Sequence, residues 1–375
     1  MGIYGPLGIL DQIEFRVLAS AGLAFLIVLL FGKRTINILA KFNIGDTGLS
    51  DAKALEHISS SKTDTPTMGG LLIALAVFTS TFLFADITER WVRLGLIVLL
   101  WMSAVGAVDD WLKMTAAKRG SSRQGLYAWE KLVFQLGIGA IIGYFGYQAG
   151  VSNSPVATAH VLNLPFQKTY VSAVSNQLAP GVFILPMAAY VLLSILMIAG
   201  MSNAVNITDG MDGLAAGNSA IVAIGTAVLA LIAGNQSWAQ TLLVPFVSNA
   251  GEVAVLAGAL AGACLGFLWF NCFPAQIFMG DTGALCIGGL LGYIAIVTRQ
   301  EVIVLIMGGV FLFELASVAM QVLYYKSTGG KRIFRCAPFH HHLHLGGWNE
   351  QQIVTRLWIV TVLLTMVGFT LLKLR

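Results

Sequence analysis

Acidic residues gather at a few points between the long apolar stretches of this 375-residue chain. Asp109 and Asp110 stand side by side, Lys113 follows one helical turn later, and Asp281 lies in the string FMGDTG at 278–283. Carboxylate oxygens are hard ligands that suit Mg²⁺, and Mg²⁺ in turn suits phosphate chemistry. These residue types therefore predict a magnesium site at which a phosphate reacts, with the lysine available to attract that phosphate.

Each acidic group also has an ordinary structural explanation. Asp109, Asp110 and Lys113 could form a solvated helix end in which the cation lies one turn from the anions. Asp281 stands where the N-cap of the following helix is expected. The sequence alone leaves both explanations open.

A second polar group combines asparagine, aspartate and glycine over eleven positions. These residue types permit tight turns and left-handed backbone, and the start of the next helix offers N–H groups to an anion. An ordinary turn with a helix cap needs fewer such residues, so we expect a ligand here. The members are Asn203, Asn206, Asp209, Gly210, Asp212 and Gly213.

Three consecutive histidines, His340–His342, follow a basic stretch near the C-terminus. Consecutive side chains cannot all point one way on a helix, so they would surround a ligand from several sides. A zinc site that includes Cys336 is the weaker alternative, because the spacing is irregular and hard oxygen ligands dominate the other groups. Glu314 is the one acid deep in an apolar run, where a functional and a hydrogen-bonded structural role are both open.

The composition indicates an all-α integral membrane protein. Hydrophobic residues make up 57% of the chain and charged residues only 11%, against roughly 25% in soluble domains. A spanning helix needs about 20 mainly apolar residues. Ten such stretches are predicted, at about 17–36, 69–87, 93–112, 130–149, 181–200, 214–233, 251–270, 282–298, 302–324 and 353–372.

Lysine and arginine predict the orientation, because cytoplasmic loops carry an excess of both. The basic loops follow the first, third and ninth stretches, so both chain ends are expected outside. All of the polar groups above then lie in or beside five cytoplasmic loops. These loops are about 37–68, 109–129, 201–213, 271–281 and 325–352. The external segment 150–180 is assigned no chemistry.

Glycines at regular intervals predict close helix packing. Gly258, Gly262 and Gly266 form a small-xxx-small ridge without a polar flank, which favours a helix-packing face over a nucleotide loop. The eighth apolar stretch is short, and it needs its glycines at 288, 289 and 292 to pack tightly.

Five strings together resemble the signature loops of a known enzyme group, over nearly the whole chain. They are TPTMGG (65–70), VDDWLK (108–113), SNAVNITDGMDGLA (202–215), FMGDTG (278–283) and APFHHHLHLGGW (337–348). The aspartate strings are similar to those of the polyprenyl-phosphate N-acetylhexosamine-1-phosphate transferase superfamily. The triple histidine resembles its phospho-N-acetylmuramoyl-pentapeptide transferase branch, since amino-sugar relatives generally carry a different histidine motif.

The resemblance implies a reaction, a location and partners. Undecaprenyl phosphate would attack the phosphate next to the sugar in UDP-MurNAc-pentapeptide, which gives lipid I and UMP with Mg²⁺ as cofactor. The enzyme would serve peptidoglycan synthesis in the bacterial cytoplasmic (inner) membrane, with its active site facing the cytoplasm. It would have no nucleic-acid partner, and a homodimer is implied.

The resemblance also implies roles for the residues of the acidic groups. Asp281 would be the main magnesium ligand, and Asp109 would bind or deprotonate the lipid phosphate with Asp110 beside it. Lys113 and Lys131 would steady phosphates.

The remaining implied roles concern the donor substrate. Asn206 and Asp209 would lie near the pyrophosphate and the sugar, and Phe278 would stack on uracil. His340 would matter most for the rate among the groups at the sugar and peptide. The residues implied with Phe278 in a uridine pocket are Lys62, Gly210, Met211, Asp212 and Asn271. Those implied with His340 on the sugar–peptide side are Gln321, His341 and His342. Thr67 and Asn203 are implied as further substrate-binding residues.

Three alternatives remain open at this stage. A relative that transfers GlcNAc-1-phosphate to the same lipid would act on UDP-GlcNAc. A membrane transporter would place its acidic residues near the middle of the membrane and move solute without a covalent product. A non-catalytic lipid-binding scaffold would function without Asp281.

Overall fold

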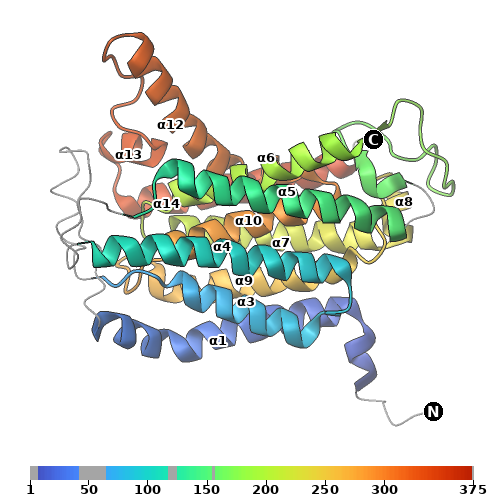
Figure 1. Ribbon diagram of the computed structural model, residues 1–375, viewed down its shortest axis with the longest axis horizontal. Helices are drawn as coiled ribbons and strands as arrows, with labels where there is room; N and C mark the ends of the chain where they lie inside the picture. The colour runs from blue at the N-terminus through green and yellow to red at the C-terminus, as the bar shows by residue number, and fades with distance from the viewer. Residues whose placement is uncertain (1–6, 42–64, 117–124, 154–156, 374–375) are drawn as a thin grey trace.

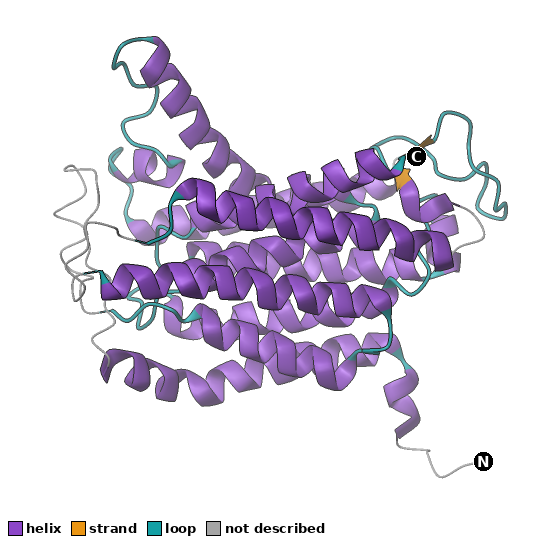
Figure 2. Ribbon diagram, viewed as in Figure 1, coloured by secondary structure: helices purple, strands orange, loops and turns teal. Residues whose placement is uncertain are grey.

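Long apolar helices and their connections account for nearly all of the computed structural model, with one small two-stranded sheet (Figure 2). The structure describes residues 7–41, 65–116, 125–153 and 157–373, so the predicted Lys62 lies outside the described residues. The elements on the first half of the chain are η1 (Leu7–Asp11), α1 (Ile13–Lys41), α3 (Gly70–Phe84), α4 (Arg90–Thr115), α5 (Ala128–Asn153), η4 (Ala157–His160), β1 (Val161–Leu162), β2 (Phe183–Ile184) and α6 (Met187–Thr208). Those on the second half are α7 (Leu214–Gly234), α8 (Gln236–Thr241), α9 (Gly251–Asn271), α10 (Gly280–Thr298), α11 (Glu301–Met307), α12 (Gly309–Ser327), α13 (Phe339–His344) and α14 (Glu350–Lys373).

The apolar helices bear out an all-α integral membrane protein. Among the described residues, eight helices are long and apolar enough to cross a membrane, or nine if the bent pair α11–α12 counts as one span. The apolar helix α3 is shorter, with 15 residues. Helices suit a bilayer because they satisfy their own backbone hydrogen bonds where water is absent. That the chain crosses the membrane ten times stays a prediction.

The helix predicted at 302–324 is not continuous, and that prediction was wrong. The chain forms α11 and then α12, which meet at Gly308 with a bend of 80°. Two adjacent glycines, Gly308 and Gly309, put little side-chain bulk at this point, and paired small residues are a known cause of sharp kinks. Beyond the bend α12 leaves the bundle at a steep angle (Figure 1).

The predicted helix at 181–200 begins later than expected. Residues 183–184 pair instead with Val161–Leu162 in the antiparallel sheet, and Pro186 precedes the first turn of α6. At its other end α6 continues to Thr208, so Asn203 and Asn206 lie on a helix and not in the predicted loop 201–213. The connection between α5 and α6 therefore contains a short sheet that the polar, turn-rich sequence did not predict.

Helix α10 lies at the centre of the bundle, between α4, α6 and α7. Its residues from Asp281 to Thr298 are all buried. Its glycines pack tightly, as predicted. Gly288 and Gly292 lie directly against the α6 backbone, and Gly289 lies against Met102 of α4. A helix that is apolar all round is expected in such a buried position.

The ridge Gly258–Gly262–Gly266 of α9 is a helix-packing face, as predicted, and its partner is α1. A Cβ added at Gly258 or Gly266 would lie 2.7 Å from the Val17 carbonyl oxygen or 2.9 Å from the Phe25 carbonyl oxygen. At Gly262 it would overlap the backbone of Ala21. Without side chains at these positions the two helix backbones can approach closely, which is how helices associate in a bilayer.

The two ends of the bundle differ in their chemistry. The end of α4, the start of α10 and α13 lie at one end, whereas η1, the small sheet and the last turns of α14 lie at the other (Figure 1). At the second end Arg299 and Glu301 are buried, with 2.7 Å between Nη2 of Arg299 and Oε1 of Glu301. The Arg299 guanidinium also donates to the Val161 carbonyl at 3.0 Å. This buried pair therefore links the small sheet to the junction between α10 and α11.

We predict that Gly262→Ala lowers the thermal unfolding midpoint of the purified protein in detergent. The new methyl group would overlap the Ala21 backbone and force α1 and α9 apart, and overpacking of this kind costs about 1–3 kcal/mol. Gly22→Ala is the matched control, because nothing lies within 4 Å of a Cβ at that position on α1. Equal midpoints for the two variants would contradict the packing role of the ridge.

Candidate active site

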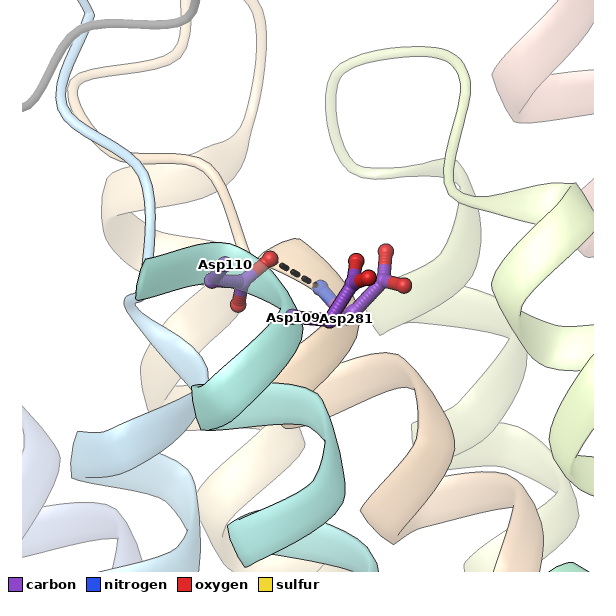
Figure 3. A group of neighbouring side chains, drawn as sticks. All are labelled: Asp109, Asp110 and Asp281. Atoms are coloured by element: carbon purple, nitrogen blue, oxygen red, sulfur yellow. Dashed lines mark hydrogen bonds between the residues drawn. The ribbon is translucent and has the colours of Figure 1, made fainter. Parts of the chain in front are cut away.

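Three carboxylates from two helices converge at one end of the bundle. Asp109 and Asp110 lie near the end of α4, Asp281 lies in the first turn of α10, and all three are buried. Each offers an oxygen within 4.8 Å of those of the other two (Figure 3). Gly106 makes this approach possible, because a Cβ there would overlap the Asp281 carbonyl.

Asp110 binds the backbone at the start of α10. Its carboxylate accepts hydrogen bonds from the backbone N–H groups of Asp281 and Thr282, both at 3.0 Å, and from the Thr282 hydroxyl at 2.6 Å. The first of these bonds is drawn in Figure 3. The first N–H groups of a helix have no partner within it and favour negative charge nearby. Asp110 thus caps α10 from a neighbouring helix and fixes the position of Asp281.

The N-cap explanation of Asp281 is wrong. The N-cap position of α10 falls on Met279, and Asp281 lies inside the helix with its carboxylate directed toward the cluster. The capping function belongs to Asp110, which is distant in sequence.

Two lysines compensate the other two carboxylates. The Lys113 ammonium lies 2.7 Å from Asp109 Oδ2 and 3.1 Å from Asp281 Oδ1. Lys131, on α5, lies 2.9 Å from Asp109 Oδ2 and 2.6 Å from Asp281 Oδ2. Buried charges are expensive unless they are paired, so this four-group network lets two anions persist at the edge of the bundle. The structure thus brings Lys131 to the site, as the sequence resemblance implied.

The last turn of α6 and the residue after it add further polar groups beside Asp281. The Asn206 side chain donates to Asp281 Oδ1 at 3.0 Å. Burial and the negative charges of Asp281 and Asp110 raise the pKa of Asp209 to about 7. Asn203, by contrast, donates to Gln135 Oε1 of α5 at 2.7 Å and makes none of the contacts within the carboxylate cluster.

Two residues implied for a uridine pocket hold neighbouring loops together. Asp212 accepts a hydrogen bond from the Ala275 N–H at 2.9 Å, and its own N–H donates to Glu350 at 2.8 Å. The buried Asn271 side chain accepts from the Gly213 N–H and donates to the Ile277 carbonyl. Sequence analysis missed Glu350, because nothing in its local sequence reveals a partner 138 positions away.

Met211, Phe278 and Thr67 were also implied as substrate contacts. Met211 is buried against Leu214 and Ile353. Phe278 is half-buried, and its backbone exchanges hydrogen bonds with Pro66 and Gly69 in the segment before α3.

Thr67, in the segment before α3, lies next to Gly280 at the start of α10. A Cβ at Gly280 would lie 3.0 Å from the Thr67 hydroxyl and 2.6 Å from Asp110. The TPTMGG string therefore lies beside the carboxylate cluster.

The three histidines lie on the short helix α13 and have different surroundings. His340 is buried, and its Nε2 lies directly against Gly210. The Nδ1 of His342 accepts a hydrogen bond from the Arg335 N–H at 3.1 Å, and the ring stacks on Phe339. His341 lies beside His340, with 4.3 Å between the ring centroids.

Gln321 is occupied by the chain that precedes α13. Its carbonyl accepts from the N–H groups of Ile333 and Phe334, and its amide donates to the Phe334 carbonyl. Of the groups implied at the sugar and peptide, His340 lies against the loop 209–213, at Gly210.

The donor set fits a hard divalent cation. Both oxygens of Asp110 are occupied by α10, whereas the oxygens of Asp281 and Asp109 Oδ2 face lysine ammonium groups or the Asn206 amide. A cation of high charge density can compete with such ammonium groups for carboxylate oxygens. Asp281 and Asp109 are thus the residues placed to hold a metal ion.

Residues 92–299 match the family model for glycosyl transferase family 4. The match covers 208 of the 375 residues, from α4 to the end of α10, and includes the three carboxylates. The chain belongs to this family. It is therefore a membrane-embedded phospho-sugar transferase of the polyprenyl-phosphate superfamily, whose substrates are a nucleotide sugar and a polyprenyl phosphate, and whose members are typically metal-dependent.

We predict that Asp110→Asn lowers the unfolding midpoint more than Asp281→Asn when both are measured without divalent cations. Asparagine has one acceptor oxygen, so a buried N–H or hydroxyl at the start of α10 would lose its partner, at a cost of about 1–3 kcal/mol. Asp281→Asn leaves these bonds intact. Thermal unfolding in detergent measures the difference, and an equal or larger drop for Asp281→Asn would refute the capping role.

Proposed function

We propose that this protein transfers phospho-MurNAc-pentapeptide from UDP-MurNAc-pentapeptide to undecaprenyl phosphate and so produces lipid I and UMP for peptidoglycan synthesis. The observation that carries the proposal is the cluster of Asp109, Asp281, Lys113 and Lys131 at one end of a membrane bundle of this family. The segment APFHHHLHLGGW supports the muramoyl-peptide donor.

The reaction is a phosphoryl transfer in which positioning and charge neutralisation supply most of the catalysis. An oxygen of the lipid phosphate attacks the phosphorus next to the sugar. The new P–O bond forms as the bond to UMP breaks, and UMP leaves with the electron pair. A lipid phosphate is already mostly ionised near neutral pH, since its second pKa is about 6, so it needs a positioner more than a base.

The residues of the site would act by holding charge in place. Lys113 and Lys131 would steady the phosphate oxygens, and Asn206 would orient Asp281. Asp281, with Asp109 beside it, would hold Mg²⁺, which supplies neutralisation of the negative charge on the pyrophosphate. Asp110 would keep Asp281 fixed through the start of α10 and touch no substrate.

The proposal includes an orientation in the membrane. The basic loops after the first, third and ninth apolar stretches support a position of the carboxylate end on the cytoplasmic side of the bacterial inner membrane. That is the side on which a nucleotide-sugar donor is available, while the lipid acceptor arrives from the bilayer.

The deciding experiment measures UMP release by the purified protein with undecaprenyl phosphate, with and without Mg²⁺. We expect Mg²⁺-dependent UMP and a lipid-linked product with UDP-MurNAc-pentapeptide, and about 100-fold or greater loss in Asp281→Asn, since one well-placed charge contributes that much. Release with UDP-GlcNAc alone would assign the protein to the amino-sugar branch. Full activity of Asp281→Asn would remove the metal-ligand role.

We also predict that Phe278→Ala raises the KM for the nucleotide donor. Stacking of a base on an aromatic ring contributes about 1–3 kcal/mol, which corresponds to about a 5- to 150-fold change. The matched control is Phe183→Ala, which removes an exposed aromatic ring in the small sheet at the opposite end of the bundle. An unchanged KM in Phe278→Ala would exclude Phe278 from the uridine pocket.

A further inference from the structure

Glu314 is a buried acid that the chemistry above does not use. It lies in the second turn of α12 and is only 1% exposed. Its Oε2 lies 3.2 Å from Nδ1 of His340 and accepts a hydrogen bond from the His340 backbone N–H at 3.3 Å. A buried carboxylate is costly without such partners, so the contact with His340 accounts for its position in an apolar run.

The other side of the His340 ring faces the loop after α6. A Cβ at Gly210 would overlap Nε2 of His340, so the ring lies directly on this glycine. Gly210 follows Asp209, whose pKa is raised by burial and then by the nearby charges of Asp281 and Asp110. One imidazole therefore spans the space between Glu314 on α12 and the loop that borders the carboxylate cluster.

The bend between α11 and α12 makes this contact possible. A straight helix would continue along the axis of α11, whereas the 80° turn at Gly308 directs α12 across α6 and α13. The break in the helix thus delivers Glu314 to His340, which is 26 residues further along the chain.

We propose that Glu314 is a positioning residue that acts through His340. The carboxylate keeps a proton on Nδ1 and fixes the ring plane, so that Nε2 faces the 209–213 loop and a substrate bound there. A neutral imidazole has one donor and one acceptor nitrogen, and a carboxylate beside one nitrogen determines the state of the other. The inference rests on the proposed function for its substrate, since Nε2 would face the phospho-sugar.

A double-mutant cycle on UMP release tests this inference. We expect Glu314→Gln to lower kcat by about 10- to 100-fold with little change in KM, as removal of an orienting partner does. In a His340→Ala background the same substitution should change kcat by less than about twofold, because coupled residues are not additive. An equal loss in both backgrounds, or no loss in either, would overturn the proposal.

Glu301→Gln is the matched control for a buried acid. Glu301 lies on α11, is as buried as Glu314, and pairs with Arg299 at the opposite end of the bundle. Its replacement should lower the unfolding midpoint and leave kcat of the folded protein within about twofold. A loss of kcat in Glu301→Gln as large as that in Glu314→Gln would mean that the Glu314 effect is one of general stability.

A spectroscopic measurement decides the same question without turnover. Histidine labelled with ¹⁵N in the full-length protein reports which ring nitrogen carries the proton, and the signals absent in His340→Ala belong to His340. We expect a protonated Nδ1 in the wild type and a changed distribution in Glu314→Ala. An unchanged distribution would overturn the proposal, whereas failure to use the muramoyl donor would refute only the proposed function.

Discussion

The pairing of two buried carboxylates with two lysines is the constraint on which the rest of the site depends. Asp109 and Asp281 would repel one another in a medium of low polarity, and Lys113 and Lys131 offset that repulsion at 2.6–3.1 Å. The four groups come from α4, α5 and α10, so the end of α4 must meet the starts of α5 and α10. In a site that already balances opposite charges, a carboxylate can exchange its ammonium partner for a metal cation. An ammonium group can likewise exchange its carboxylate partner for a phosphate.

The membrane environment explains why so few polar residues achieve this geometry. Helices α4 and α10 bury apolar surfaces against one another, and glycine contacts bring their backbones close. Because the packed helices cannot shift without losing these contacts, the first turn of α10 is held rigidly. Asp110 completes the restraint by binding the N–H groups of that turn. Rigid placement of charge is what a phosphoryl transfer requires.

The sequence predicted the helical architecture and most of the acidic cluster, because both follow from local patterns. Apolar length predicted the helices, and the DDxxK and MGDTG strings predicted Asp109, Asp110, Lys113 and Asp281 as members of one site. The glycine ridge on α9 was predicted for the same reason, since its spacing is periodic.

What the sequence could not predict depends on partners that are distant in the chain. The carboxylate of Asp110 caps a helix about 170 positions away in the sequence. The polar side-chain atoms of three other predicted residues form hydrogen bonds with neighbouring loops: Gln321, His342 and Asn271. The break at Gly308 was missed because Gly308 and Gly309 lie inside an apolar run whose hydropathy continues across them. Only the three-dimensional packing shows whether such a residue is available to a substrate.

The central claim is that the carboxylates of Asp281 and Asp109, which pair with Lys113 and Lys131, form a cation site. Binding of Mn²⁺ to the purified protein, followed by electron paramagnetic resonance, tests it most directly and needs no substrate. The account predicts one site in the wild-type protein, its loss in Asp281→Asn, and its retention in Phe278→Ala. Undiminished Mn²⁺ binding by Asp281→Asn would contradict the account.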